Sequence, residues 1–138
     1  MQDRFKFRCW HEPTETMYEV FDFNENFIRA TPDLVVPSIR TLNAMNCVLM
    51  QCTGLKDKNG KLIYEGDIVS VKVQTQDFFN VEEYYSENYK GEIIFKEGEF
   101  AIRVIDTKKQ PIALYYYANG CEVIGNIYEN PELLENKQ

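Results

Sequence analysis

The chain is built from short stretches in which apolar and polar positions alternate, which is the periodicity of half-buried β-strands. In residues 68–73, which read Ile-Val-Ser-Val-Lys-Val, the side chains of Val69, Val71 and Val73 share one face. Two turn signals come before this stretch: Asn59-Gly60 predicts a tight type I′ turn, and Glu65-Gly66-Asp67 predicts a second reversal. Residues 51–73 are therefore expected to form strands closed by turns.

A second hairpin is predicted around Glu97-Gly98, because apolar positions alternate on both sides of these two residues. The register that follows contains the pairs Lys96–Glu99, Phe95–Phe100 and Ile93–Ile102. The apolar pairs and Val104 then share one face, and the opposite charges lie on the other face.

The C-terminal part contains two further signals. Residues 112–118 and 121–125 flank Asn119-Gly120, which predicts another type I′ hairpin. Asn130-Pro131 is typical of a helix N-cap followed by a first-position proline, so a short C-terminal helix is expected to pack Leu133 or Leu134 against the strands.

The N-terminal part predicts a β-hairpin formed by residues 5–10 and 17–23, with a turn-like connection around Pro13. Arg4, Lys6 and Arg8 would share one strand face, either as a solvated face or as a basic strip that binds anions. Residues 24–46 are expected to be loop with one or two helical turns, one opened by Thr31-Pro32 and one capped by Ser38. Residues 47–50 form an apolar run that predicts a buried strand.

These elements predict a mainly β protein, either a small barrel or a sandwich, with short helical segments. A length of 138 residues fits a single domain. Residues 1–50 would form an N-terminal hairpin lobe with a connecting segment, and residues 51–138 would form the barrel.

The segment of residues 77–90 breaks the strand pattern by mixing carboxylates with aromatic side chains, and it is predicted to be an insertion loop or a mobile hairpin. Residues 77–100 hold seven acidic and two basic residues, a net charge of −5. The aromatic side chains either pack on the barrel while the charges are solvated, or they form a surface for a basic or proline-rich partner. The candidate binding residues are Phe78, Phe79, Glu82, Glu83, Tyr84, Tyr85 and Tyr89.

Composition limits the chemistry. The net charge of −7 opposes non-specific binding to nucleic acid, which needs clustered Lys and Arg. Cys9, Cys47, Cys52 and Cys121 show no zinc-type spacing and are expected to be reduced core thiols. No apolar run approaches the length of a membrane helix, so a cytoplasmic protein is expected.

No catalytic or cofactor-binding motif is present in the sequence. His11, the single histidine, stands in a predicted turn and is expected to be an exposed bystander. The sequence therefore predicts no catalytic residues, no metal site and no cofactor, and a protein that is not an enzyme.

Four segments carry a resemblance to a known family. KFRCW with MYEV after it, QCTGLKDKNGKLIYEGDIV, GEIIFKEGEFAI and VIGNIYENPELL resemble successive signature segments of the YopX family of phage and prophage proteins. Cys9, His11 and Cys52 depart from the residues frequent in the family. The resemblance implies a phage or prophage origin, an SH3-like β-barrel and self-association, and it supplies no catalytic residues.

Three functions follow as hypotheses. The first is a non-enzymatic module that binds a protein partner through residues 77–90. The second is a homo-oligomeric structural phage protein in which Phe5, Phe7 and Trp10 contact a neighbouring subunit. The third and weakest is a nucleic-acid-binding barrel that uses Arg4, Lys6, Arg8, Lys56, Lys58 and Lys61.

Overall fold

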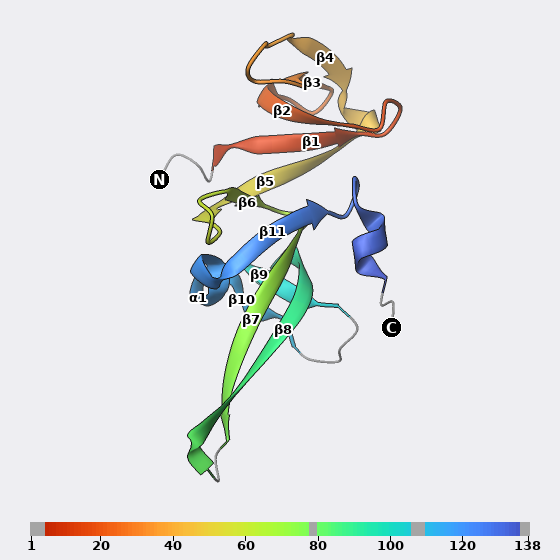
Figure 1. Ribbon diagram of the computed structural model, residues 1–138. Coiled ribbons are helices and arrows are strands. Elements are labelled where there is room, and N and C mark those ends of the chain that lie inside the picture. The colour runs from red at the N-terminus through yellow and green to blue at the C-terminus, as the bar shows by residue number, and fades with distance from the viewer. Residues whose placement is uncertain (1–4, 78–79, 106–109, 136–138) are drawn as a thin grey trace. The chain divides into compact units, whose positions relative to one another are not determined.

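The structure is a computed structural model that describes residues 5–77, 80–105 and 110–135, with side chains described outside residues 73–87. The chain divides into unit 1, Met1–Gly54, and unit 2, Leu55–Gln138 (Figure 1). The strands are β1 (Phe7–His11), β2 (Thr16–Phe23), β3 (Phe27–Thr31), β4 (Arg40–Asn43), β5 (Cys47–Lys56), β6 (Leu62–Tyr64), β7 (Asp67–Asp77), β8 (Asn80–Lys96), β9 (Glu99–Val104), β10 (Ile112–Ala113) and β11 (Cys121–Asn126). The helical elements are η2 (Ala44–Asn46), α1 (Leu114–Tyr117), η3 (Ala118–Gly120) and η4 (Pro131–Leu134).

Unit 1 is built on an antiparallel sheet in the order β4-β3-β2-β1-β5. The next strand in this sheet, β6, is hydrogen-bonded to β5. The predicted N-terminal hairpin is confirmed, with β1 and β2 paired from Phe7↔Val20 to His11↔Thr16. The run that begins at Cys47 is a strand as predicted. Cys9, Tyr18, Ile28, Ala30 and Leu42 form the core of the unit on one face of the sheet.

The prediction of helical turns in residues 24–46 is wrong for most of that segment, which contains β3 and β4. Burial alternates along β3, since Ile28 and Ala30 are buried and Arg29 is exposed. This two-residue period favours a strand once a sheet is available to cover the buried face. Thr31-Pro32 ends β3 instead of opening a helix, and the one short helical element is the 3-10 turn η2.

The strand face that carries Arg8 was predicted to be either a solvated face or a basic strip that binds anions. The first interpretation is wrong for Arg8. Arg8 is only 8% exposed and lies opposite Glu19 in the β1–β2 ladder. Burial raises the pKa of the Glu19 carboxyl, and the charges of Arg8 and Lys6 oppose this rise. Arg8 is therefore buried and is withdrawn from any exposed anion-binding strip.

Unit 2 contains an antiparallel sheet in the order β10-β9-β8-β7-β11. The predicted hairpin around Glu97-Gly98 is confirmed with its register, from Gly91↔Val104 to Lys96↔Glu99. Both turn residues have positive φ, 53° for Glu97 and 83° for Gly98. The core of the unit is formed by Ile63, Val69, Val71, Ile93, Ile102, Leu114, Ala118 and Cys121.

The turn at Asn59-Gly60 is not type I′, because only Gly60 has positive φ, at 82°. The Gly60 N–H donates to the Asp57 carbonyl at 3.0 Å, and the Asp57 N–H donates to the Lys61 carbonyl at 2.8 Å. This is a longer loop that ends in a left-handed glycine, the common alternative to a two-residue turn. The reversal at Glu65-Gly66 is confirmed, with Gly66 at φ 82°.

The predicted type I′ hairpin at Asn119-Gly120 is wrong. After the two residues of β10, the chain enters α1 and then the 3-10 turn η3, and Gly120 is not among the residues with positive φ. Leu114 and Ala118 are buried while Tyr115 and Tyr116 are exposed, so burial in this segment follows the four-residue spacing of a helix. The burial of Leu114 and Ala118 therefore favours a helix over the hairpin that Asn119-Gly120 predicted.

The SH3-like barrel is not confirmed. Within the described part of unit 2, β10 and β11 are the two ends of an open sheet and do not pair with each other. The C-terminal helix is a single 3-10 turn, η4, and a Cβ added at Gly125 would meet the Leu133 side chain at 2.9 Å. No helix in the described residues is long and apolar enough to cross a membrane.

Candidate functional site

The most extended feature of unit 2 is the distal part of the hairpin formed by β7 and β8. These strands pair antiparallel from Ile68↔Glu92 to Gln76↔Tyr84 and again at Asp77↔Asn80. The neighbouring strand β11 pairs with β7 no further than Val71. On the other side, β9 pairs with β8 only from Gly91 onward. Residues 72–77 and 80–90, here called the ribbon, therefore pair only with each other among the described strands, and they project from the sheet (Figure 1).

The direction of the ribbon's backbone groups follows from one hydrogen bond. The Lys90 carbonyl accepts from the Ile105 N–H at 2.9 Å, so the backbone groups of Lys90 face the β9 side. Backbone direction alternates along a strand, so those of Asn88 and Ser86 face the same side, beyond the end of β9. Gln74 lies directly opposite Ser86, and by the same alternation its backbone groups face the other edge. The ribbon thus presents two edges of main-chain donors and acceptors.

The structure places the predicted binding residues in different settings. Phe78 and Phe79 lie outside the described residues. Glu82, Glu83, Tyr84 and Tyr85 belong to β8, where the backbone is described and the side chains are not. Tyr89 is half-buried and packs against the core of unit 2. Of the two alternatives for the backbone, a loop or a hairpin, the structure shows a hairpin.

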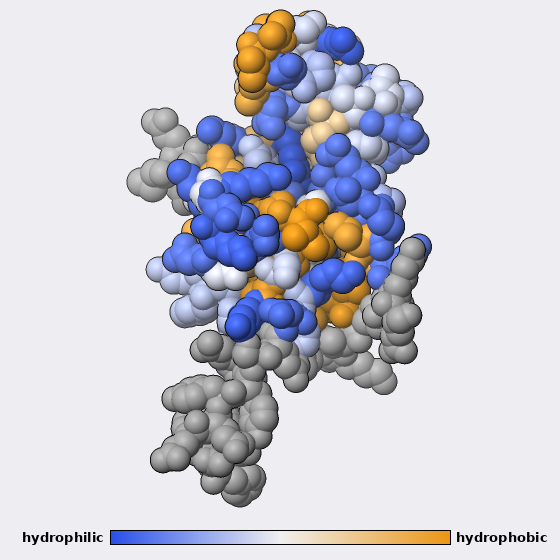
Figure 2. Space-filling view, viewed as in Figure 1, coloured by the Kyte–Doolittle hydropathy of each residue, from blue (hydrophilic) through white to orange (hydrophobic). Residues whose placement is uncertain are grey.

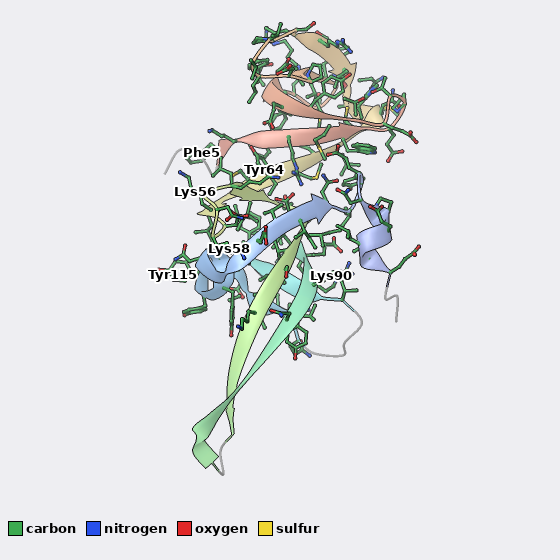
Figure 3. All side chains as sticks on the ribbon, viewed as in Figure 1. Phe5, Lys56, Lys58, Tyr64, Lys90 and Tyr115 are labelled. Carbon is green, nitrogen blue, oxygen red and sulfur yellow. The ribbon has the colours of Figure 1, made fainter. Side chains whose placement is uncertain are left out.

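A pair of tyrosines on α1 was missed by the sequence analysis. Tyr115 and Tyr116 are 75% and 80% exposed, and their rings meet edge to face with centroids 5.4 Å apart. Figure 3 shows Tyr115 at the outer end of this short helix. The four-residue spacing of Leu114 and Ala118 was the signal that could have placed both tyrosines on a solvent-facing helical turn.

The basic residues considered for nucleic acid are divided between the units. Arg4 lies outside the described residues, Lys6 is exposed and Arg8 is buried. Lys56, Lys58 and Lys61 are exposed in unit 2, where Figure 3 labels the first two. The Lys58 ammonium pairs with the Glu122 carboxylate at 3.4 Å, which reduces the positive charge there.

The N-terminal aromatic residues proposed for self-association differ in exposure. Phe5 is 64% exposed, whereas Trp10 is half-buried. Phe7 is also half-buried and contacts Phe23 edge to face, with ring centroids 5.2 Å apart. Only Phe5 therefore offers most of its surface to a neighbour.

The four cysteines are free thiols. Burial raises the pKa of Cys9 to about 12, with a smaller contribution from Cys47, and raises that of Cys121 to about 11, with a contribution from Asp57. Burial also raises the pKa of Cys47. The thiols of Cys9, Cys47 and Cys121 are thus protonated near neutral pH, which makes them poor nucleophiles and poor metal ligands.

No other reactive constellation is found in the described residues. They contain no group of three or more His, Cys, Asp or Glu side chains arranged to hold a metal ion. His11 lies 2.6 Å from the Thr14 hydroxyl through Nδ1, and its ring meets Tyr18 edge to face at 5.9 Å. Its nearest described partners are thus a turn hydroxyl and a tyrosine ring, neither of which orients a general base.

Comparison with known proteins decides the family. The family model described as YopX protein matches residues 6–135. The chain belongs to the YopX family. The crystal structure of protein EF1440 from Enterococcus faecalis is similar to this YopX chain, with 31% sequence identity, a TM-score of 0.59, and coverage of 94% of this chain and 97% of that chain. No curated protein matches the chain.

Proposed function

We propose that this YopX protein is a non-enzymatic protein-binding module of a phage or prophage, and that it acts in the host cytoplasm. The partner would be held on the β8 edge of the ribbon, around Ser86 and Asn88. The observation that supports this most is the extension of β7 and β8 beyond both of their neighbours, which leaves outward-facing backbone groups along the ribbon.

An edge of this kind recognises an extended segment by adding it to the sheet as a further strand. Main-chain hydrogen bonds then supply the affinity, and charges on the flanking side chains select the partner. Natural proteins usually block such an edge because it attracts other strands, so a projecting ribbon favours a binding role.

The charge of the ribbon indicates the chemistry of the partner. Strand β8 carries Glu82, Glu83, Glu87 and Glu92 against two basic residues, Lys90 and Lys96. A segment rich in Lys and Arg would therefore be favoured beside it. Two copies of this edge would repel each other, which disfavours self-pairing at the ribbon.

Two proline substitutions test the proposal. Ser86→Pro removes an N–H that faces the β8 edge, and Gln74→Pro, its matched control, removes the opposite N–H that faces the β7 edge. Neither N–H belongs to the β7–β8 ladder, so both variants are expected to keep the thermal melting profile of the parent chain. In pull-downs from infected host lysate, Ser86→Pro should capture at least tenfold less partner, and Gln74→Pro should capture as much as the parent.

A defined ligand makes the test independent of the host. A peptide of alternating Lys and Val should bind the parent chain, and a Glu and Val peptide should not, as measured by fluorescence anisotropy. Equal binding of both peptides, or equal capture by both proline variants, would refute the proposal. Turnover of a captured protein, with a new covalent product visible by mass spectrometry, would overturn the non-enzymatic part.

A further inference from the structure

The loop between β3 and β4 in unit 1 exposes a group of large apolar side chains that the sequence analysis did not single out. The exposed fractions are 59% for Leu34, 88% for Val35, 73% for Val36 and 63% for Ile39. Figure 2 shows a hydrophobic cluster over this loop, at the top of the view. Contiguous apolar exposure of this kind marks an interaction surface more often than single exposed residues do.

The loop is fixed by local hydrogen bonds. The Asp33 carboxylate accepts from the Val35 N–H at 2.8 Å. The Thr31 hydroxyl accepts from the Ser38 N–H at 3.0 Å and donates to the Asp33 carbonyl at 2.9 Å. These side chains set the course of the backbone, so the apolar groups are displayed at a lower cost in loop entropy when they bind.

The strand that follows the loop is an edge strand. In the order β4-β3-β2-β1-β5, β4 has one neighbour, β3. The Ala44 N–H donates to the Asn26 carbonyl at 2.9 Å, in register with the pair Phe27↔Asn43. By alternation, the backbone groups of Leu42 face β3 and those of Thr41 face outward.

A second apolar group lies at the other end of β4. Met45, in the 3-10 turn η2, is 91% exposed. Along the chain the order is thus an apolar loop, an edge strand and an exposed methionine. When two copies of β4 run antiparallel, the apolar loop of each copy lies at the same end as Met45 of the other. A two-fold symmetric interface requires a surface that matches its own copy in this way.

We infer that β4 pairs antiparallel with β4 of a second copy of this chain, centred on Thr41. In that register Thr41 lies opposite its own equivalent, and η2 of one copy, which follows β4, comes beside the loop that precedes β4 in the other copy. Met45 then covers the apolar loop twice, once on each side of the two-fold axis. Arg40 lies opposite Leu42, so no like charges are placed directly across the pair.

The size of the surface sets the strength of the dimer. The surface that a four-residue strand and five apolar side chains can bury is smaller than the roughly 800 Å² per subunit that a standard stable interface buries. The dimer should therefore form in a concentration-dependent way, with a Kd on the order of tens of micromolar. The proposed interface shares no residue with the ribbon.

Sedimentation velocity over a range of about 1 μM to about 1 mM tests the association of the full chain. Val36→Lys and Met45→Lys should each raise the Kd at least tenfold. Tyr116→Lys changes a residue that is also highly exposed, at 80%, but lies in unit 2, and should leave the Kd unchanged. A strict monomer at all concentrations, or an equal effect of all three substitutions, would overturn the inference.

A cross-link tests the register itself. Two Thr41→Cys chains would bring their Cα atoms to about 5.5 Å, within disulfide range, because hydrogen-bonded antiparallel pairs have this spacing. With copper phenanthroline as oxidant, Thr41→Cys should form a covalent dimer at least tenfold faster than the control Tyr116→Cys. Equal rates would contradict pairing through β4, even if the chain dimerises elsewhere.

Discussion

Asp57 shows how one carboxylate joins separate parts of unit 2. Its Oδ1 accepts from the N–H groups of Asn59 and Lys61, both at 2.9 Å, and its Oδ2 accepts from the Val123 N–H at 2.9 Å. Burial by itself would raise the pKa of Asp57, but these three donors and the Lys61 charge lower it below its ordinary value of 3.8. The sequence analysis placed Asp57 beside a turn, and its contact with β11 is what gives it a long-range role.

Asp57→Ala is expected to destabilise the fold by about 2–4 kcal/mol, because three backbone donors lose a charged acceptor. Urea denaturation measures this, and Glu99→Ala, which removes an exposed carboxylate, should cost under about 0.5 kcal/mol. A cost for Asp57→Ala no larger than that of the control would contradict the role of Asp57.

The lowered pKa of Asp57 predicts an acid-sensitive stability. The charged form is favoured in the folded chain, so its contribution is complete above the unfolded-state pKa near 3.8 and is lost as the pH falls through the lower folded-state pKa. Urea midpoints measured between pH 6 and pH 2 should fall less steeply below about pH 4 in Asp57→Asn than in the parent chain. Parallel curves for both proteins would rule out this linkage.

Gly91 marks a close approach between β8 and β9. A Cβ at this position would collide with the Ile102 side chain, which is fully buried, and would lie 3.2 Å from the Arg103 carbonyl. Gly91→Ala is therefore expected to cost about 1–3 kcal/mol in the free energy of unfolding. Gly120→Ala is the matched control, since a Cβ there meets nothing within 4 Å and should change stability by less than about 0.5 kcal/mol.

At the scale of elements, local signals predicted the β1–β2 and β8–β9 hairpins, whereas the local signals at Asn59-Gly60 and Asn119-Gly120 predicted the wrong turn type. The β8–β9 hairpin was predicted with its register because Glu97-Gly98 and the charge pair beside it act within a few residues. The segments that became β3 and α1 were misread, because the burial of their apolar residues depends on elements outside each segment. For β3 the deciding partner is the sheet of unit 1, which the sequence does not display.

The same limit applies to the candidate sites. The acidic and aromatic composition of residues 77–90 identified the ribbon, but its pairing as two strands depends on continuation of the sheet register beyond Val71. Residues 34–39 were predicted to belong to a loop with one or two helical turns. Its apolar content became informative only when the structure showed these side chains exposed and not buried.

The β8–β9 turn also predicts a stabilising substitution. Glu97 has φ 53°, a left-handed conformation that costs energy for most side chains and that Asn tolerates better. Glu97→Asn is expected to raise the free energy of unfolding by about 0.5 kcal/mol in urea denaturation. Glu99→Asn, at the first residue of β9, should lower the free energy of unfolding, because Asn is unfavourable in strands.

At the scale of the whole molecule, the excess of negative charge separates the two proposed interactions. The chain has 22 acidic and 15 basic residues, and seven of the acidic residues lie in residues 77–100. Binding of a basic segment at the ribbon would depend on this charge. The β4 interface would instead join Leu34, Val35, Val36, Ile39 and Met45 with main-chain hydrogen bonds.

Salt should therefore weaken peptide binding at the ribbon and leave the β4 dimer unchanged or slightly tighter. Raising the ionic strength from about 0.1 M to about 1 M shortens the Debye length from about 10 Å to about 3 Å, so the affinity for the Lys and Val peptide should fall at least tenfold. Apolar contacts are not screened, so the dimer Kd should change less than about twofold or become tighter. Anisotropy titrations and sedimentation velocity in the same buffers measure both. Loss of the dimer in high salt would contradict an apolar interface, and salt-independent peptide binding would contradict selection by charge at the ribbon.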